Sequence, residues 1–234
     1  MSRTASVLLL SIAISRAQDA RQPRRVDPGD TAHPPSDATV VFNGKNMDGW
    51  TTIEGKAAGC TASEGVMSCT SGAGDIMTQD KFGSTQLHLE FNIPPMPEQH
   101  GQLRGNSGVY LHGKYEIQIF DSYENPTYAR GSLGALYGQA APLVNAARKP
   151  GEWQTYDIIF HAPVCDPADA KVIRKAMVTV VLNGVLVQDR VAIVASEAPA
   201  AGCETGPLRL QDHSGFPGAP VTTMRFRNIW WRAL

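Results

Sequence analysis

Long apolar runs and blocks of one charge are both scarce in this sequence. Among its 234 residues, 21 are basic and 22 acidic, without a long run of either sign, so the charge pattern of a nucleic-acid-binding protein is missing. The apolar run at residues 7–14 is far shorter than the roughly 20 residues that span a bilayer. We therefore expect no nucleic-acid partner and no membrane span, and the oligomeric state stays open.

The sequence also lacks the short motifs of several catalytic classes. No GxSxG elbow, Walker loop, GxGxxG turn or HExxH helix is present, which disfavours the enzyme classes built on them. The four cysteines show no CxxC spacing, and no histidine lies beside them, so a zinc site is disfavoured as well. The chemistry has to come from another arrangement.

The first 37 residues are typical of an export signal followed by a linker. Arg3, the apolar run and the small residues around Ala17 predict a secretory signal peptide over residues 1–17. Residues 18–37 are rich in arginine and proline, and such a composition predicts a flexible leader. Residues 38–234 are then one domain of a periplasmic or secreted protein, with enough hydrophobic residues for a sizeable core.

The cysteines predict disulfides, because an exported chain meets an oxidising compartment. Four cysteines allow three pairings. Cys60 with Cys69 and Cys165 with Cys203 is the favoured pairing, since the first two flank a segment that looks like a hairpin.

Short segments rich in β-branched or aromatic residues follow residue 38, separated by Gly, Pro and Asn and with hardly any helical periodicity. This pattern predicts an antiparallel sandwich or barrel. Asn183-Gly184 predicts a type I′ hairpin, and residues 121–150 predict a long functional loop. The expected strands cover residues 40–42, 66–69, 86–93, 108–112, 115–120, 153–161, 177–182, 185–189, 208–212 and 224–231.

Two segments, residues 115–120 and 207–213, alternate apolar with polar side chains. Successive side chains of a strand point to opposite faces, so each segment places its polar residues in one row. Trp50, Tyr110 and Tyr137 could add surfaces for stacking on a sugar. If both strands join one sheet, planar donors and acceptors suited to sugar hydroxyls line one concave surface: Glu116, Gln118, Arg209, Gln211 and His213.

Each of these residues also has an ordinary structural interpretation, which stays open at this point. Glu116 could lie on a solvated face or pair with Arg209, and His213 could cap a turn. Retaining sandwich glycosidases place two carboxylates at alternate positions of one strand, but here the second position is Gln118. The sequence therefore disfavours hydrolysis by two carboxylates on one strand.

Several segments together resemble the 3-keto-disaccharide hydrolase family, and the resemblance covers residues 38–234 in the right order. It implies a concanavalin A-like jelly roll of two antiparallel sheets, with a sugar pocket on the concave face. The segments are FNGKNMDGW from Phe42, NSGVYL from Asn106 with YEIQIFDS from Tyr115, GEWQTYD from Gly151, the stretch from Gly206 to His213, and FRNIW from Phe226.

The resemblance also implies activity on glycosides already oxidised at carbon 3, cleaved by elimination across carbons 1 and 2 and then hydrated. The ketone acidifies the proton on carbon 2, so a base removes it while an acid helps the aglycone to leave. On this hypothesis Glu116 and His213 are base and acid in either order. The other expected pocket residues hold hydroxyls and the enolate oxygen: Asn106, Tyr110, Gln118, Asp121, Tyr137, Arg209, Gln211 and Arg227.

Two points about this site stay open. Asp121 has the opposite parity from Glu116, so it joins the pocket only through a bulge or the strand end. We expect no cofactor, although a divalent metal bound by Glu116 and His213 could serve as the electrophile. The alternatives to an enzyme acting on an oxidised oligosaccharide or glycoside are a carbohydrate-binding module on the same sandwich and a conventional glycoside hydrolase.

Overall fold

The computed structural model describes residues 22–30, 33–194 and 203–234. The chain divides into two compact units at Ala38, and all strands of the described residues belong to the second unit, Ala38–Leu234. The signal peptide expected over residues 1–17 lies outside the described residues. Within those ranges, no helix is both long and apolar enough to cross a membrane.

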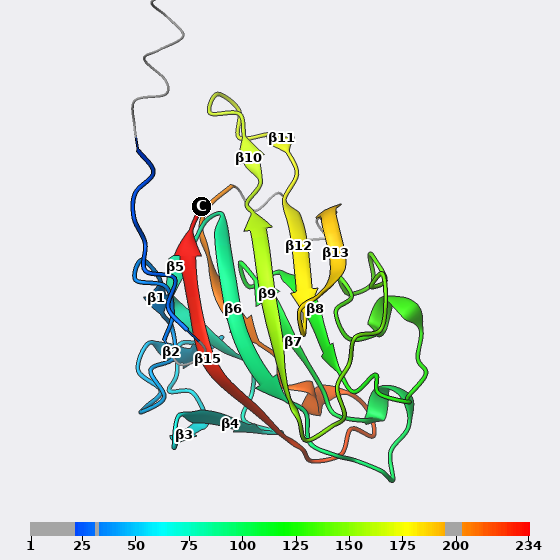
Figure 1. Cartoon of the computed structure of the whole chain (residues 1–234). Helices are drawn as coiled ribbons and strands as arrows, with labels where there is room; N and C mark the ends of the chain where they lie inside the picture. Colours follow the sequence, from blue (N-terminus) through cyan, green and yellow to red (C-terminus); the bar gives the residue numbers. More distant parts are fainter. Residues whose placement is uncertain (1–21, 31–32, 195–202) are drawn as a thin grey trace, which may run out of the picture. The chain divides into compact units, whose positions relative to one another are not determined.

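The second unit is a sandwich of two antiparallel sheets, with β6 and β9 in the front layer of Figure 1 and β7 and β8 behind them. The larger sheet has the order β13-β12-β9-β6-β15-β4-β3, and β1 pairs with β15. The expected all-β jelly roll is therefore confirmed. The larger sheet is made of β1 (Thr39–Val40), β3 (Thr61–Ser63), β4 (Val66–Thr70), β6 (Thr85–Asn92), β9 (Trp153–His161), β12 (Met177–Leu182), β13 (Val185–Ala192) and β15 (Thr223–Ala233).

The smaller sheet has the order β2-β5-β14-β7-β8, and a separate two-stranded pair stands apart from both sheets. Three short 3-10 helices complete the elements of the described residues. The bounds are β2 (Trp50–Thr52), β5 (Ile76–Phe82), β7 (Asn106–Leu111), β8 (Tyr115–Phe120) and β14 (Gly206–Leu210), then β10 (Val164–Cys165) and β11 (Val172–Arg174), and η1 (Gly101–Leu103), η2 (Ala129–Gly131) and η3 (His213–Gly215).

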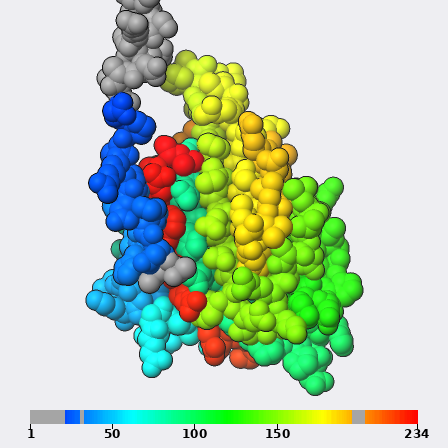
Figure 2. Space-filling view, viewed as in Figure 1, coloured from blue at the N-terminus to red at the C-terminus, as the bar shows by residue number. Residues whose placement is uncertain are grey.

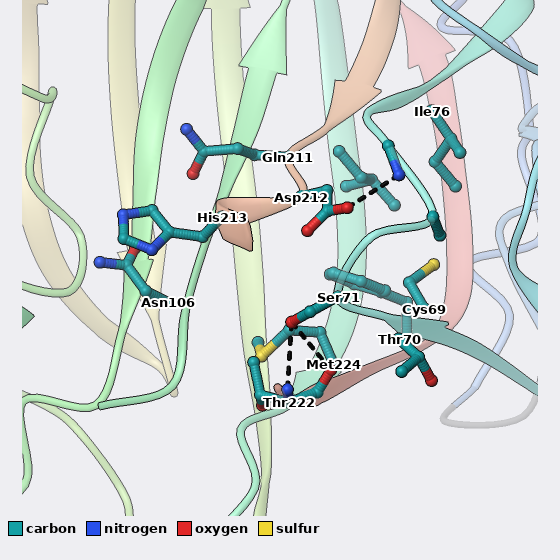
Figure 3. A pocket seen from close by; sticks show the side chains of 14 residues that line it. Cys69, Thr70, Ser71, Ile76, Asn106, Gln211, Asp212, His213, Thr222 and Met224 are labelled. Atoms are coloured by element: carbon teal, nitrogen blue, oxygen red, sulfur yellow. Dashed lines mark hydrogen bonds between the residues drawn. The ribbon is translucent and has the colours of Figure 1, made fainter. Parts of the chain in front are cut away.

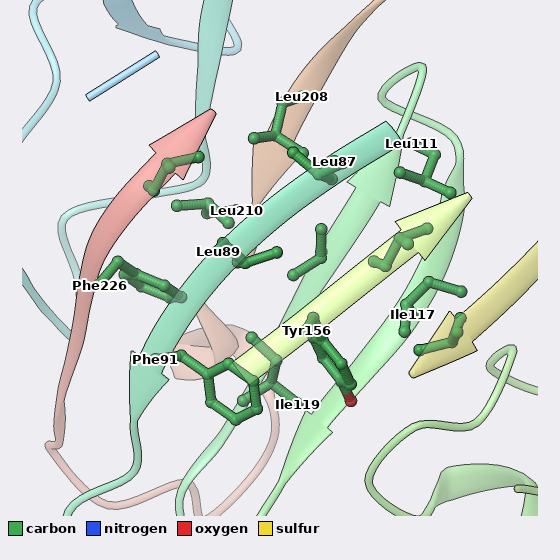
Figure 4. Close-up of a cluster of buried hydrophobic side chains, with 14 of the residues drawn as sticks. Leu87, Leu89, Phe91, Leu111, Ile117, Ile119, Tyr156, Leu208, Leu210 and Phe226 are labelled. Atoms are coloured by element: carbon green, nitrogen blue, oxygen red, sulfur yellow. The ribbon is translucent and has the colours of Figure 1, made fainter. Parts of the chain in front are cut away.

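The core lies between the two sheets, where alternate residues of both face inward. Leu87 and Leu89 of β6 share one buried cluster with Leu208 and Leu210 of β14 (Figure 4). Burying a side chain of this size contributes about 1.5–3 kcal/mol. The inward faces therefore hold the sandwich together, and the outward faces are left for other roles.

Residues with positive φ lie in two hairpin turns. Asn183 and Gly184 have φ values of 53° and 81°, as the predicted type I′ turn requires. Between β7 and β8 the positive φ values fall on His112 and Gly113. His112 is thereby turned into the core, where its ring contacts Phe160.

The long loop expected over residues 121–150 connects the edges of both sheets. Tyr137 donates its backbone N–H to the carbonyl oxygen of Glu116 on β8, and Leu143 donates to Val187 on β13. Figure 2 shows this loop, in green, beside β13, in gold. The loop thus covers the free edge of β8 and is itself fixed by backbone hydrogen bonds.

Two disulfides join Cys60 to Cys69 and Cys165 to Cys203, which is the pairing favoured from the sequence. The first ties the residue before β3 to β4, and the second ties β10 to the segment that precedes β14. Two disulfides fit an extracellular or periplasmic protein.

Candidate active site

One row of side chains crosses the smaller sheet from β5 to β8. The register pairs Met77 with Arg209, Arg209 with Tyr110, and Tyr110 with Glu116. Directly paired residues of neighbouring strands point to the same face, so these side chains stand side by side on the face opposite the core. The two polar strands of the sequence therefore belong to one sheet, with β7 between them.

A cavity of about 390 Å³ lies on this face. Its volume falls within the range of small-molecule sites. The structure brings Glu116 and His213 to this one cavity. Its lining includes most of the residues expected from the sequence, namely Asn106, Tyr110, Glu116, Gln118, Tyr137, Gln211 and His213, together with Asp212, Gly215, Phe216 and Pro217.

Glu116 has the electrostatics of a proton-transfer group. Burial raises its pKa from 4.5 to about 7, while the Tyr110 hydroxyl and the Arg209 guanidinium oppose this rise. The Tyr110 hydroxyl in turn accepts a hydrogen bond from Gln211 Nε2 at 3.0 Å. A carboxyl group with a pKa near neutrality can either donate or accept a proton at pH 7.

Gly108 makes room for this carboxyl group. It pairs with Gln118 in the register between β7 and β8, next to the pair of Tyr110 and Glu116. A Cβ atom at position 108 would lie 2.5 Å from Glu116 Oε1 and 3.0 Å from Tyr110 Cε2. Glycine is needed here because the carboxyl group approaches the backbone closely.

His213 begins η3, shortly after the end of β14, and its neighbour Asp212 anchors the turn. Asp212 Oδ2 accepts hydrogen bonds from the backbone N–H groups of Gly72 and Gly74, each at 2.8 Å. Figure 3 shows Asp212 on one side of the chain, toward that backbone, and Gln211 and His213 on the other. Burial lowers the pKa of His213 below 6.5, partly offset by the Asp212 carboxylate. The imidazole is therefore mostly neutral at pH 7.

Three side-chain amides in the lining each have a buried carbonyl oxygen without a hydrogen-bond partner in the described part of the chain. All three of their nitrogens are held. Asn106 Nδ2 donates to Gln102 Oε1 at 2.9 Å, Gln118 Nε2 donates to the Gly131 carbonyl at 3.3 Å, and Gln211 Nε2 donates to the Tyr110 hydroxyl. Buried polar atoms are rarely left unpaired. A ligand with several hydroxyl donors would satisfy these oxygens, which belong to Asn106, Gln118 and Gln211.

Arg209 lies beside the cavity and not in its lining. Its guanidinium carbon is 3.8 Å from the centroid of the Tyr110 ring. Its Nε is 3.3 Å from Asp75 Oδ2, without the alignment of a hydrogen bond. Arg209 therefore pairs with Asp75 rather than with Glu116, and it supports the cavity through the Tyr110 ring.

The structure corrects the expectation for Asp121. Its carboxylate is buried, with Oδ2 3.2 Å from Arg104 Nη1 and Oδ1 accepting from the Tyr123 N–H at 3.1 Å. No bulge brings it to the side of Glu116, because β8 keeps regular pairing up to Phe120. Asp121 thus anchors the start of the loop and does not line the cavity.

Arg227 and Trp50 are also placed elsewhere. Arg227 belongs to β15 of the larger sheet, where its Nη2 lies 2.7 Å from Glu90 Oε2. Trp50 is buried in the core, and its indole N–H donates to the Val41 carbonyl. Both residues were expected near the sugar because their types suit binding, but sheet order and strand parity direct them away from this cavity.

Two aromatic residues near the cavity were not among the site residues expected from the sequence. The Tyr128 hydroxyl is 2.7 Å from that of Tyr137, and the Phe216 ring stacks on His213 with centroids 5.1 Å apart. Both residues lie in loops, where strand alternation gives no signal. An aromatic residue between Gly215 and Pro217, just after a polar strand, was the available clue.

The donor set of the cavity does not suit a divalent metal. The described residues contain no group of three or more His, Cys, Asp or Glu side chains that could hold a metal ion. The second acidic residue of the lining, Asp212, already accepts backbone N–H groups on both oxygens. Only Glu116 and His213 are then left as ligands, so we assign no step to a metal.

Residues 37–232 match a family model described as a 3-keto-alpha-glucoside-1,2-lyase-like domain. The chain belongs to this family. The resemblance inferred from the sequence is thereby confirmed. A candidate glycosyl hydrolase of Parabacteroides distasonis ATCC 8503, known from a crystal structure, is 37% identical, with 97% of this chain and 100% of that chain covered and a TM-score of 0.82.

More distant structures share the fold of this family member. A second candidate glycosyl hydrolase of Parabacteroides distasonis ATCC 8503 is 20% identical, with a TM-score of 0.61 over 85% of this chain and 94% of that chain. A variant of the alginate lyase Aly36B, in complex with alginate tetrasaccharide, is 11% identical, with a TM-score of 0.52 over 84% and 96%. Comparison with curated proteins finds no match. Family membership supports a carbohydrate-active, hydrolase-like role.

Proposed function

We propose that the protein cleaves glycosides already oxidised at carbon 3, by elimination across carbons 1 and 2 followed by hydration, which amounts to hydrolysis. One observation carries the proposal. Glu116, with a pKa of about 7, shares a cavity with a mostly neutral His213 and with three unpaired amide oxygens that can accept sugar hydroxyls. Membership in the family supports the oxidised substrate.

The cavity offers one available carboxyl group, which fits elimination better than direct hydrolysis. Conventional retaining hydrolysis needs a second carboxylate about 5 Å from the first. The other acid of the lining, Asp212, is held by backbone N–H groups on both oxygens. A keto sugar avoids this need, because the ketone itself acidifies the proton that must be removed.

We assign the base to His213 and the acid to Glu116. A neutral imidazole accepts the proton of carbon 2, and the electron pair forms the enolate of the ketone at carbon 3. The enolate then expels the aglycone oxygen from carbon 1, while protonated Glu116 donates its proton to that oxygen. Water adds to carbon 1 of the resulting enone and a proton returns to carbon 2, which gives the free 3-keto sugar. The Tyr110 hydroxyl is a donor of the lining that can stabilise the enolate.

The reaction class is tested with 3-keto-trehalose and β-linked 3-keto-disaccharides, with the unoxidised sugars as controls. Release of free sugar from the oxidised compounds alone is the expected result. Release from the unoxidised sugars would instead indicate a conventional glycosidase. Sugar binding without turnover, unaltered in Glu116→Gln and His213→Ala, would indicate a binding module.

The two roles are separated with 3-keto-1,5-anhydroglucitol, a keto sugar that has no aglycone to expel. A base exchanges its carbon 2 proton for solvent deuterium, and the carbon 4 proton on the other side of the ketone is an internal control in the NMR spectrum. His213→Gln should lose exchange at carbon 2. Glu116→Gln should keep the exchange and lose disaccharide cleavage, by about 10²- to 10⁴-fold. Loss of exchange in Glu116→Gln alone would reverse the assignment.

A further inference from the structure

Two aromatic pairs flank the floor of the cavity. Tyr137 is bound to the outer edge of β8 and pairs with Tyr128, while His213 follows β14 and stacks on Phe216 with an interplanar angle of 23°. Between the Tyr137 segment and β14 lie β8 and β7. Three strand spacings separate the two sides by about 14 Å. A molecule bound over the polar floor therefore has an aromatic surface at either side.

The tyrosine pair is held in place before any ligand binds. Tyr128 is 51% exposed, yet its ring lies so close to Gly131 that a Cβ atom at position 131 would clash with it. The same glycine accepts a hydrogen bond from Gln118 on the cavity floor. The backbone N–H of Tyr137 is bonded to the Glu116 carbonyl, and its hydroxyl is bonded to that of Tyr128. Part of the ordering that ligand binding would otherwise impose is therefore already present.

Phe216 presents an apolar surface on the other side. Its side chain is 45% exposed although it lines the cavity, and Pro217 follows it in the lining. The charged side chains of the lining, apart from His213, are the acids Glu116 and Asp212, and neither Lys nor Arg is among the described lining residues. An anionic group would therefore find no cation in the lining to pair with, and an ionised Glu116 would repel it.

We propose that Phe216 and the pair of Tyr128 and Tyr137 form the aglycone subsite, which takes an uncharged ring with a flat apolar face. This inference rests on the proposed function, since the polar floor holds the keto sugar and the aromatic side chains are left for the group attached to carbon 1. An aryl group and the apolar face of a pyranose share this chemistry. The aromatic side chains thus determine which aglycones are accepted.

The test uses 3-keto C-glucosides of both anomers, in which a carbon–carbon bond at carbon 1 prevents departure of the substituent, so calorimetry reports binding alone. The substituents are methyl, phenyl, pyranosylmethyl and carboxymethyl. Phenyl or pyranosylmethyl should bind about tenfold more tightly than methyl, and carboxymethyl should bind no more tightly than methyl. Which of the two rings gains more identifies the source of the aglycone.

Phe216→Ala should remove the advantage of the ring substituents and leave the methyl compound unchanged, whereas Phe216→Tyr should keep the advantage. Leu143→Ala is the matched control, because Leu143 is an exposed apolar residue that lines a different cavity. Equal binding of methyl and ring compounds, or equal losses for both in Phe216→Ala, overturns the subsite. Deuterium exchange of 3-keto-1,5-anhydroglucitol needs no aglycone. If either of these results is found and the exchange is still observed, the subsite alone has failed. Absence of both exchange and methyl-compound binding overturns the proposed function together with the subsite.

Discussion

The two sheets each carry polar side chains on their outward faces, and the two sets differ in their hydrogen bonding. On the larger sheet, His88 Nδ1 lies 2.7 Å from Asp157 Oδ1, and Glu90 bonds both Arg227, at 2.7 Å, and Asn228, at 3.1 Å. On the smaller sheet, three amide oxygens of the described residues have no partner at all. The first set satisfies its own hydrogen bonds, whereas the second leaves acceptors open, which we propose are filled by a ligand.

This difference separates a structural cluster from a binding site where residue types alone do not. A histidine bonded to an aspartate is a common catalytic arrangement, and His88 with Asp157 has its geometry. However, the other ring nitrogen of His88 faces Asn228 Nδ2 at 3.3 Å, and the ring stacks on Trp230. Both nitrogens of His88 are engaged, so we interpret it as part of the sheet surface rather than as a proton carrier.

Glu116→Gln should show the largest effect and should change activity and stability in opposite directions. Cleavage of 3-keto-trehalose should fall by about 10²- to 10⁴-fold. Because the pKa is raised from 4.5 to about 7 by folding, the folded state holds the proton more tightly, and wild-type stability falls as pH rises through this window. This decrease in the free energy of unfolding is complete above pH 7 and amounts to about 3 kcal/mol. Urea unfolding should therefore find the variant more stable than the wild type at pH 8.

The same measurement at pH 4 is the control, since the carboxyl group is protonated there in both states and the stability gain should disappear. A gain of equal size at pH 4 and pH 8 would show that ionisation of Glu116 is not its cause.

Gly108→Ala should lower activity by displacing the Glu116 carboxyl group, without removing any catalytic group. The new Cβ atom would lie 2.5 Å from Glu116 Oε1, so the carboxyl group has to move. A displacement of this kind costs on the order of 10²-fold in kcat/KM. Gly83→Ala is the matched control, because its nearest contact would be 3.9 Å away and its φ is not positive. Similar kinetics for the two variants would contradict the role given to Gly108.

Gln118→Met should weaken binding without weakening the fold. The change removes an unpaired buried oxygen, and the Gly131 carbonyl keeps its second donor, Gln102 Nε2, at 3.3 Å. The free energy of unfolding should stay level or rise, because an unsatisfied polar group is lost. The kcat/KM for the keto sugar should fall by about tenfold. A clear loss of stability with unchanged kinetics would place Gln118 with the structural residues.

Arg227→Met should give the reverse result and the smallest effect on catalysis. Arg227 pairs with Glu90 and lies over the Trp153 ring, with its guanidinium carbon 4.1 Å from the centroid. Half-exposed contacts of this kind contribute about 1 kcal/mol, which chemical denaturation should detect. The kcat/KM should stay within about twofold of the wild type. A large decrease in kcat/KM would indicate that Arg227 contacts the substrate after all.

Strand alternation predicted the polar face well, because the side chains of a strand alternate with a period of two whatever surrounds it. Glu116 and Gln118 share a face, as do Arg209 and Gln211, which both contact the Tyr110 side chain. The same reasoning missed β5, whose centre is the polar run Gln79-Asp80-Lys81. It also did not predict that His112 turns into the core, since this depends on positive φ at a turn.

The sequence by itself determined the apolar and polar rows, the Asn-Gly hairpin, the cysteine pairing favoured for an exported chain, and the family. Only the tertiary structure decided which rows meet. Arg227 and Arg209 look equally suitable in the sequence, yet sheet order places one in each layer. Phe216 lines the cavity because it comes directly after η3, the short helix that follows β14. Parity is a local property of the chain, whereas the pairing of strands almost 100 residues apart depends on how the whole core packs.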